Sequence, residues 1–155
     1  MKKLLLFLAI LLCLGFAAVA LAGDVDVDLV CPTNVTTGSP LSVTVYAYNW
    51  DCNNSVTVNR AMSGLGGNSG GSIGSAGMWG PYNETIGNRI IPAATCVWPT
   101  APGELIPPAR VRIVDAVPAS LANTVAVVFF ELLTSDGKSM GGDGCMVNVS
   151  PAPVQ

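Results

Sequence analysis

The sequence contains no histidine, and only 11% of its residues are charged. Histidine is the usual general base near neutral pH and the commonest zinc ligand, so its absence removes the central group of many hydrolases and metal sites. The Gly-x-Ser-x-Gly pattern of serine hydrolases occurs around Ser69, Ser72 and Ser139, but no histidine is present to activate these serines. Glu84 and Glu104 could form a glycosidase pair, although any two acids in a chain meet that description. We therefore predict a noncatalytic protein without a cofactor.

Basic residues are scarce as well, since the chain has 7 of them against 10 acidic residues. Two of these, Lys2 and Lys3, precede a long apolar run that ends in Ala20-Leu21-Ala22. A basic start, an apolar stretch and a small-residue ending are the three parts of a secretory signal peptide. We expect cleavage after Ala22, which makes residues 1–22 the signal and residues 23–155 a secreted, periplasmic or cell-surface protein.

Membrane attachment is the alternative to release. The run from Leu4 to Ala22 is close to the roughly 20 apolar residues that cross a bilayer, so an uncleaved signal would act as an anchor. Lipid attachment at Cys13 is disfavoured, because Leu12 stands before it instead of the small residue that lipoprotein signals need. We expect contact with a membrane only if the signal is retained.

The mature chain has the size and composition of one globular domain. Removing 22 of the 155 residues leaves 133, which is enough for a single core. Valine, isoleucine and leucine are plentiful in short runs, which argues against disorder. The remaining 5 basic and 10 acidic side chains give a net charge of −5. This balance disfavours binding to nucleic acid or to anionic lipid.

Four cysteines remain after cleavage, at positions 31, 52, 96 and 145. An even number in an oxidising compartment predicts two disulfides, and four cysteines allow three pairings that the sequence alone does not separate. No Cys-x-x-Cys spacing is present. Zinc held by all four thiolates is the alternative, but such ligands normally occur in close pairs. We favour structural disulfides.

Apolar and polar residues alternate with the period of two that is typical of strands. In Leu41–Tyr48, for example, every second residue is apolar. We expect seven strands, over residues 24–30, 41–48, 56–62, 86–91, 110–114, 124–133 and 145–149. In the third of these, Val56, Val58, Arg60 and Met62 share one face.

Two further segments carry a distinct prediction. Residues 64–80 contain eight glycines, which predicts a long loop or linker because glycine loses much backbone entropy on ordering. Residues 124–133 are apolar without alternation, which predicts a central strand covered on both faces. Asp136-Gly137 is a turn signal before the last strand. Together the segments predict an all-β, antiparallel sandwich that forms a single domain over residues 23–155.

Aspartates form two candidate calcium sites. Asp24, Asp26 and Asp28 lie on one face of the first strand, but alternate strand residues stand about 7 Å apart and point in parallel, so they do not converge on one ion. The segment from Asp136 to Asp143 has acids in a loop but lacks the spacing of a helix-flanked calcium loop. A solvated face and an ordinary turn explain these residues better, and we predict no metal site.

Aromatic residues give the only candidate ligand-binding residues. If Leu41, Val43 and Val45 face the core, Tyr46 and Tyr48 point outward and lead to Trp50. Exposed flat rings stack on sugars and anchor protein interfaces. The alternative is that these rings cover a sheet edge or pack beneath a long loop, as the other aromatics Trp79, Tyr82 and Trp98 could also do.

Two segments resemble bacterial immunoglobulin-like domains. Thr37-Gly38 leading into Leu41–Val45 resembles the start of the second strand of that fold, and Val125–Leu132 with Cys145–Val149 resembles its last hairpin. The resemblance implies an immunoglobulin-like sandwich used for extracellular binding, adhesion or assembly. In that topology Cys52 and Cys145 lie at one end of the sandwich, which implies a Cys52–Cys145 disulfide and leaves Cys31 to pair with Cys96.

The leading hypothesis is a secreted, noncatalytic immunoglobulin-like module for protein binding, adhesion or surface assembly. The alternative is a carbohydrate-binding module that uses the aromatic face of Tyr46, Tyr48 and Trp50. A third interpretation is a structural subunit whose edge strand pairs with a neighbour. The expected partner is an extracellular protein or glycan.

Overall fold

The computed structural model describes residues 25–69 and 72–153, and the predicted signal peptide lies outside them. These residues form two β-sheets and one short 3-10 helix. The elements in chain order are β1 (Val25–Val30), β2 (Asn34–Thr36), β3 (Leu41–Asn49), β4 (Val56–Ser69), β5 (Ser72–Ile91), β6 (Gly103–Glu104), β7 (Ala109–Val114), η1 (Ala119–Leu121), β8 (Thr124–Leu133) and β9 (Ser139–Ser150). Within the described residues, no helix is long and apolar enough to cross a bilayer.

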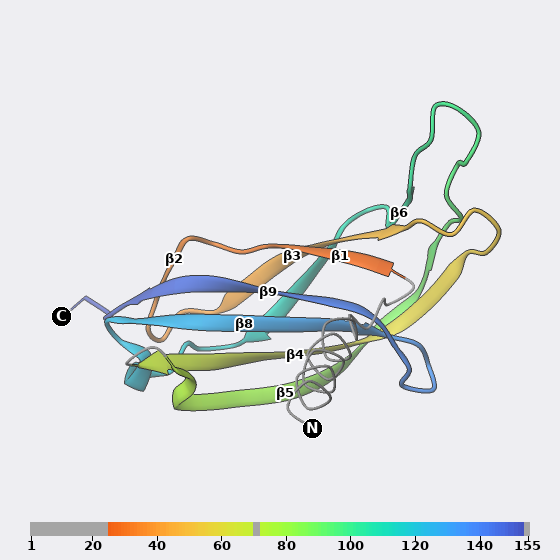
Figure 1. Cartoon of the computed structure of the whole chain (residues 1–155). Coiled ribbons are helices and arrows are strands. Elements are labelled where there is room, and N and C mark those ends of the chain that lie inside the picture. Colours follow the sequence, from red (N-terminus) through yellow and green to blue (C-terminus); the bar gives the residue numbers. More distant parts are fainter. Residues whose placement is uncertain (1–24, 70–71, 154–155) are drawn as a thin grey trace, which may run out of the picture.

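The strand order is that of an immunoglobulin-like sandwich (Figure 1). Sheet A has β3 at its centre, with β1 on one side and β6 and β7 on the other. Sheet B has the order β2-β9-β8-β4-β5. These orders correspond to strands A, B and E in one sheet and to G, F, C and C′ in the other. All pairings are antiparallel except that of β2 with β9. The predicted all-β immunoglobulin-like sandwich is confirmed.

All seven predicted strands are present, and the alternation sets which side chains enter the core. Val25 and Val27 of β1 are buried while Asp26 and Asp28 are exposed, and β3 alternates in the same way. The inward-facing side chains of both sheets belong to one hydrophobic cluster. Two short strands, β2 and β6, were not predicted, since three and two residues are too short for a periodic signal.

Strand β8 is central, as predicted, because it pairs with β4 on one side and β9 on the other. Only one of its faces is fully covered, however, which corrects the prediction. Val128 and Phe130 are buried between the sheets, whereas Val127 and Phe129 on the outer face are half-buried. A two-layer sandwich supplies no second layer for that face.

The glycine-rich segment 64–80 is not a loop, which corrects a second prediction. Its residues 64–69 are the second part of β4, and its residues 72–80 are the first part of β5. Strand β4 is hydrogen-bonded to β5 on one side and to β8 on the other, and its Leu65 is fully buried. These tertiary contacts offset the backbone entropy that glycine loses. Gly64 is required here, because a Cβ at this position would lie 2.0 Å from the Phe129 ring.

The prediction that Val56, Val58, Arg60 and Met62 share one face of β4 is also wrong beyond Val58. The register with β5 shifts between Val58 and Arg60. Val56 and Val58 are buried as expected, but the next buried side chain is Ala61, and Arg60 and Met62 are only half-buried. A bulge changes which residues of a strand face the core, and the residue pattern does not reveal it.

Both disulfide pairings differ from those the resemblance implied. Cys31 pairs with Cys145, with 6.5 Å between their Cα atoms, and Cys52 pairs with Cys96, with 5.7 Å between theirs. Cys31 follows β1, which lies along β9, where Cys145 is located. Cys52 lies in the loop after β3, beside the chain that follows β5. All four cysteines of the described residues are therefore in disulfides, as predicted.

The two long sides of the sandwich differ. On one side, β1 and β9 are tied by the Cys31–Cys145 disulfide and by a 2.9 Å hydrogen bond from the Leu29 amide to the Asp143 carboxylate. On the other side, the edge strands are β5 and β7. Because sheet B has five strands and sheet A is narrower, β5 extends beyond the cover of sheet A. This side is open.

Candidate functional site

The predicted tyrosines do lie on the outer face of sheet A. Tyr46 is opposite Asp28, and Tyr48 is opposite Asp26 and Glu104. Tyr46 is 36% exposed and Tyr48 is half-buried. Their outward direction is confirmed, and their role in ligand binding stays a prediction.

The electrostatics of this face favour a neutral Tyr48 phenol. Partial burial raises the pKa of the Tyr48 hydroxyl, and the carboxylates of Asp28, Glu104 and Asp26 raise it further. Tyr48 therefore stays protonated and can donate a hydrogen bond throughout the physiological range. The same carboxylates disfavour an anionic ligand.

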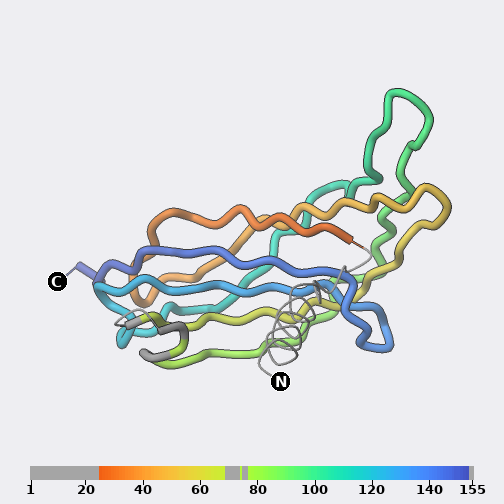
Figure 2. Tube along the Cα trace, in the orientation of Figure 1, coloured from red at the N-terminus to blue at the C-terminus, as the bar shows by residue number. Residues whose placement is uncertain are grey.

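The three most exposed large apolar side chains among the described residues lie, together with Trp50, in loops at one end of the sandwich. Trp50 is 59% exposed in the loop after β3, Val97 is 80% and Trp98 is 89% exposed in the loop between β5 and β6, and Ile106 is 76% exposed after β6. We refer to these four residues as the end surface. Figure 2 shows the loop after β5 projecting from the sandwich at the end opposite the C-terminus.

The projecting loop is held in place by covalent and hydrogen bonds. Thr95 and Ala101 form a β-bridge with backbone hydrogen bonds of 2.8 and 3.0 Å, which closes the loop below its tip. The disulfide between Cys52 and Cys96 joins the loops that carry Trp50 and Trp98. The exposed rings therefore stand on a constrained base.

Asn49 is the buried polar centre of that base. Its side chain is fully buried and donates hydrogen bonds to the Asn54 carbonyl at 2.7 Å and the Pro92 carbonyl at 3.0 Å. Its oxygen accepts a 2.9 Å bond from the Asp51 amide. One side chain thus satisfies backbone groups from the two chain segments that lead into the end surface.

Asp51 orders the turn beside Trp50. Its carboxylate accepts hydrogen bonds from the Asn54 side chain at 2.9 Å and from the backbone amides of Asn53 and Asn54. These bonds lower the pKa of Asp51, with the Asn54 side chain making the largest contribution. The turn is therefore fully formed when this carboxylate is ionised.

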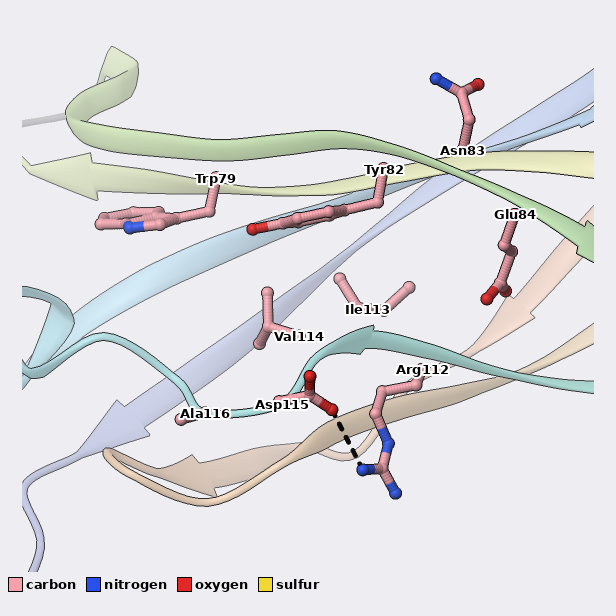
Figure 3. Close-up of a pocket in the computed structure, with 9 residues that line it drawn as sticks. All are labelled: Trp79, Tyr82, Asn83, Glu84, Arg112, Ile113, Val114, Asp115 and Ala116. Atoms are coloured by element: carbon pink, nitrogen blue, oxygen red, sulfur yellow. Dashed lines mark hydrogen bonds and ion pairs between the residues drawn. The ribbon is translucent and has the colours of Figure 1, made fainter.

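A cleft of about 500 Å³ lies on the open side of the sandwich, between β5 and β7 (Figure 3). Trp79 and Tyr82 hang from β5 toward β7, with one ring following the other along the strand. Ile113 and Val114 face them from β7. Trp79 also packs against the core, whereas Tyr82 is 46% exposed.

Glycines allow both rings to lie close to the backbone. A Cβ at Gly77 would be 2.9 Å from the Trp79 ring, and a Cβ at Gly80 would be 2.9 Å from the Ser63 carbonyl and 3.1 Å from the Tyr82 ring. Gly80 also has a φ of +103°, which side-chain-bearing residues rarely adopt. The glycines of this segment thus shape the cleft.

Polar groups line the rest of the cleft. Glu84 points toward β7, whereas Asn83 points away from the rings. Arg112 and Asp115 form a 3.2 Å ion pair on the far side. Glu104 belongs to a different surface, because it pairs with Tyr48 in sheet A, so the structure does not bring Glu84 and Glu104 into one site.

Sequence reasoning missed this cleft as a site, although it named both rings. The signal was the run from Gly77 to Tyr82, in which a glycine lies two positions before each of the two large rings. Interpreting the segment as a loop hid that signal. The cleft itself arises because sheet B is wider than sheet A, which leaves Trp79 and Tyr82 on the open side between β5 and β7.

Of the aspartates considered for calcium, Asp136 and Asp143 make hydrogen bonds within the fold. Asp26 and Asp28 lie on the solvated face of β1, as expected, and Asp24 lies outside the described residues. Asp136 accepts a hydrogen bond from the Thr134 hydroxyl, which is the main cause of its lowered pKa. The Asp143 carboxylate holds the Leu29 amide. Among the described residues, no three potential ligands form a metal-binding group.

Comparison with known proteins gives no family for this chain. No family model matches it, and no curated protein matches it. The resemblance to bacterial immunoglobulin-like domains is thus confirmed only at the level of the fold.

Solved structures with a similar arrangement include two proteins. One is Spo0M, a sporulation control protein from Bacillus subtilis, with a TM-score of 0.44, 13% identity, and coverage of 84% of this chain and 51% of Spo0M. The other is murine CRIg, with a TM-score of 0.33, 12% identity, and coverage of 82% of this chain and 98% of CRIg. This chain thus spans about half the length of Spo0M.

Proposed function

We propose that this protein is an exported, noncatalytic immunoglobulin-like module that binds an extracellular protein through the end surface of Trp50, Val97, Trp98 and Ile106. The single observation that supports it most is the exposure of Trp98, at 89%, on a loop closed by a disulfide and a β-bridge. An apolar ring held in water on a rigid loop has a hydrophobic driving force to bind and little ordering entropy left to lose.

The chemistry of the end surface favours a protein partner. Interface centres are rich in tryptophan and poor in charge, and the end surface has two tryptophans and no charged member. The neighbouring Asp51 is acidic, and the mature chain carries net negative charge, so an anionic membrane surface is a poor fit. Two disulfides agree with an oxidising, extracellular compartment.

The test is affinity capture with the protein purified from its native host and immobilised by its C-terminus. We expect a partner from envelope or culture-medium fractions to be retained by the unaltered protein and lost from the Trp98→Ala variant. Met146→Ala is the matched control, because Met146 is also exposed but lies on β9, in sheet B. A partner that both variants retain equally would contradict the proposal.

Carbohydrate binding at Tyr46, Tyr48 and Trp50 is the second candidate. It is supported by the neutral Tyr48 phenol beside the carboxylates of Asp28 and Glu104, since hydroxyl and carboxylate groups hydrogen-bond to sugar hydroxyls. A glycan array probed with the unaltered protein and with Tyr46→Ala tests it. Binding that survives this substitution would exclude this face.

A further inference from the structure

The open side of the sandwich has a feature that protein binding at the end surface does not use. Sheet B extends outward at β5, so the rings of Trp79 and Tyr82 face β7, the edge strand of sheet A, across a gap between the two sheets. On the opposite side of the sandwich, the equivalent gap is closed by a disulfide and by the bond between Leu29 and Asp143. The open side is instead hollowed into a cleft of about 500 Å³.

We propose that this cleft binds a neutral saccharide, with the sugar rings stacked on Trp79 and Tyr82. The volume lies within the roughly 300–1,000 Å³ of small-molecule sites. The axial hydrogens of a pyranose form a flat apolar face that matches the faces of aromatic rings. Two rings in sequence along β5 form a platform for adjacent units of a chain (Figure 3).

The polar groups of the cleft match sugar hydroxyls. Glu84 supplies carboxylate oxygens that accept hydrogen bonds, and Arg112 and Asp115 add donors and acceptors at the far side. Because Arg112 is paired with Asp115, the remaining charge of the cleft is that of Glu84. A negative cleft disfavours uronic and sialic acids and therefore favours a neutral saccharide.

The platform is already formed without a ligand. Trp79 packs against Gly77 and the hydrophobic core, and Gly80 places the backbone beneath Tyr82. Rings fixed by packing lose little conformational entropy when a ligand binds. Less of the favourable contact free energy is therefore spent on ordering the site, and the affinity is higher. Trp79 thus belongs to the residues packed against the core, whereas Tyr46 and Tyr48 lie on the outer face of sheet A.

The test uses Trp79 as its own reporter. The chain has three tryptophans, so in the full-length protein carrying Trp50→Phe and Trp98→Phe only Trp79 remains. We would titrate this variant with gluco-, manno-, galacto- and xylo-configured hexasaccharides and with hexagalacturonate, recording tryptophan emission and heat of binding. We expect a saturable change with at least one neutral hexasaccharide and a weaker or absent response to the acidic one.

Substitutions then locate the site. We expect Tyr82→Ala to weaken binding about tenfold, the factor for losing one aromatic contact, and Tyr82→Phe to retain it because the ring remains. Ile90→Ala is the matched control, because Ile90 is also an exposed apolar side chain of β5 but does not line the cleft. Tyr46→Ala tests the outer face of sheet A as the competing site. A thermal melt checks that each variant is folded.

Three outcomes would overturn the inference. The first is no emission change and no heat with any neutral hexasaccharide. The second is equal loss of binding in Tyr46→Ala and Tyr82→Ala, or a loss in Tyr46→Ala alone, which would move sugar binding to sheet A. The third is tighter binding of hexagalacturonate. None of these results bears on capture of a protein by the end surface, so the two proposals fail independently.

Discussion

Single residues in this protein act mainly by what they allow their neighbours to do. Gly64 admits the Phe129 ring, Gly80 places the backbone under Tyr82, and Asn49 satisfies carbonyls of two loops. None of these three contributes much apolar area itself. Their replacement should nevertheless be costly, because each leaves a clash or an unpaired buried group.

Gly64→Ala is expected to lower the free energy of unfolding by about 1–3 kcal/mol, the usual cost of overpacking. The added Cβ would lie 2.0 Å from the ring of Phe129, which comes from β8, so the ring must move away from its position against β4. Urea denaturation measures the loss. In a Phe129→Ala background the same substitution should cost much less, and an unchanged cost there would show that the ring is not the cause.

The Asp51 carboxyl is expected to titrate below the ordinary range of aspartate. A pKa that is lower in the folded than in the unfolded state gives stability that is present above about pH 4 and lost as the pH falls through the folded value. Carboxyl-detected NMR titration gives the pKa directly. Asn54→Ala should raise it by removing the side-chain donor.

Asn53→Ala is the control for that titration, because Asn53 donates to Asp51 through its backbone amide, which alanine retains. The pKa of Asp51 should stay low in the Asn53→Ala variant. Equal shifts in both variants would mean that the turn is lost as a whole rather than that one hydrogen bond is removed.

At the scale of elements, two disulfides join segments that strand pairing leaves apart. Cys31–Cys145 spans 114 residues and closes the β1–β9 side, and Cys52–Cys96 spans 44 residues and joins the loops of the end surface. Packing of side chains from both sheets in one core also holds the sandwich together. The second disulfide therefore matters most for the end surface.

Replacing Cys52 and Cys96 by serine is expected to cost about 4 kcal/mol in free energy of unfolding, the chain-entropy value for a loop of this length. The hydrogen exchange of residues 93–102 should accelerate more than that of β8, because β8 lies at the centre of sheet B. Urea denaturation and exchange mass spectrometry measure the two effects. Equal acceleration throughout would indicate that the disulfide holds the whole sandwich.

At the scale of the whole molecule, export and oxidation are linked. We propose that the predicted signal peptide directs the chain to a compartment in which disulfides form. The structure places Cys31, Cys52, Cys96 and Cys145 in two pairs, which agrees with such a compartment. A chain retained in a reducing compartment would lose both crosslinks. The stability of the fold therefore depends on where the protein is delivered.

Intact mass spectrometry of the protein from its native host tests this link. We expect a mass that begins at Gly23 and that does not increase on thiol alkylation unless the protein is first reduced. A retained N-terminus would mean that the protein is anchored by its signal, and four alkylated thiols without reduction would contradict the oxidised state.

The alternation of apolar and polar residues was enough to predict the sandwich. Val25 and Val27 in β1 and the alternate residues of β3 have a period that only a half-buried strand satisfies, and their buried faces agree with it. The apolar run of β8 likewise indicated a central strand. The outward direction of Tyr46 and Tyr48 followed from the same parity.

The remaining features depend on contacts between distant segments. Glycine preferences predicted a loop over residues 64–80, but hydrogen bonding of β4 to β5 and β8 makes this segment a hairpin. The disulfide partners depend on which strands meet at the edge of the sandwich. The positions of the cysteines in the sequence do not reveal which strands these are. The cleft at Trp79 and Tyr82 depends on the unequal widths of the two sheets.

The sequence by itself thus determined the all-β class, the inward faces of β1 and β3, the central position of β8 and the outward tyrosines, because side-chain parity is a local property of a strand. Only the tertiary structure decided the disulfide partners, the hairpin of the glycine-rich segment, the end surface and the cleft between β5 and β7. Each of these features arises where segments far apart in the chain contact each other. The free energy of those tertiary contacts outweighs the local conformational preferences of the residues.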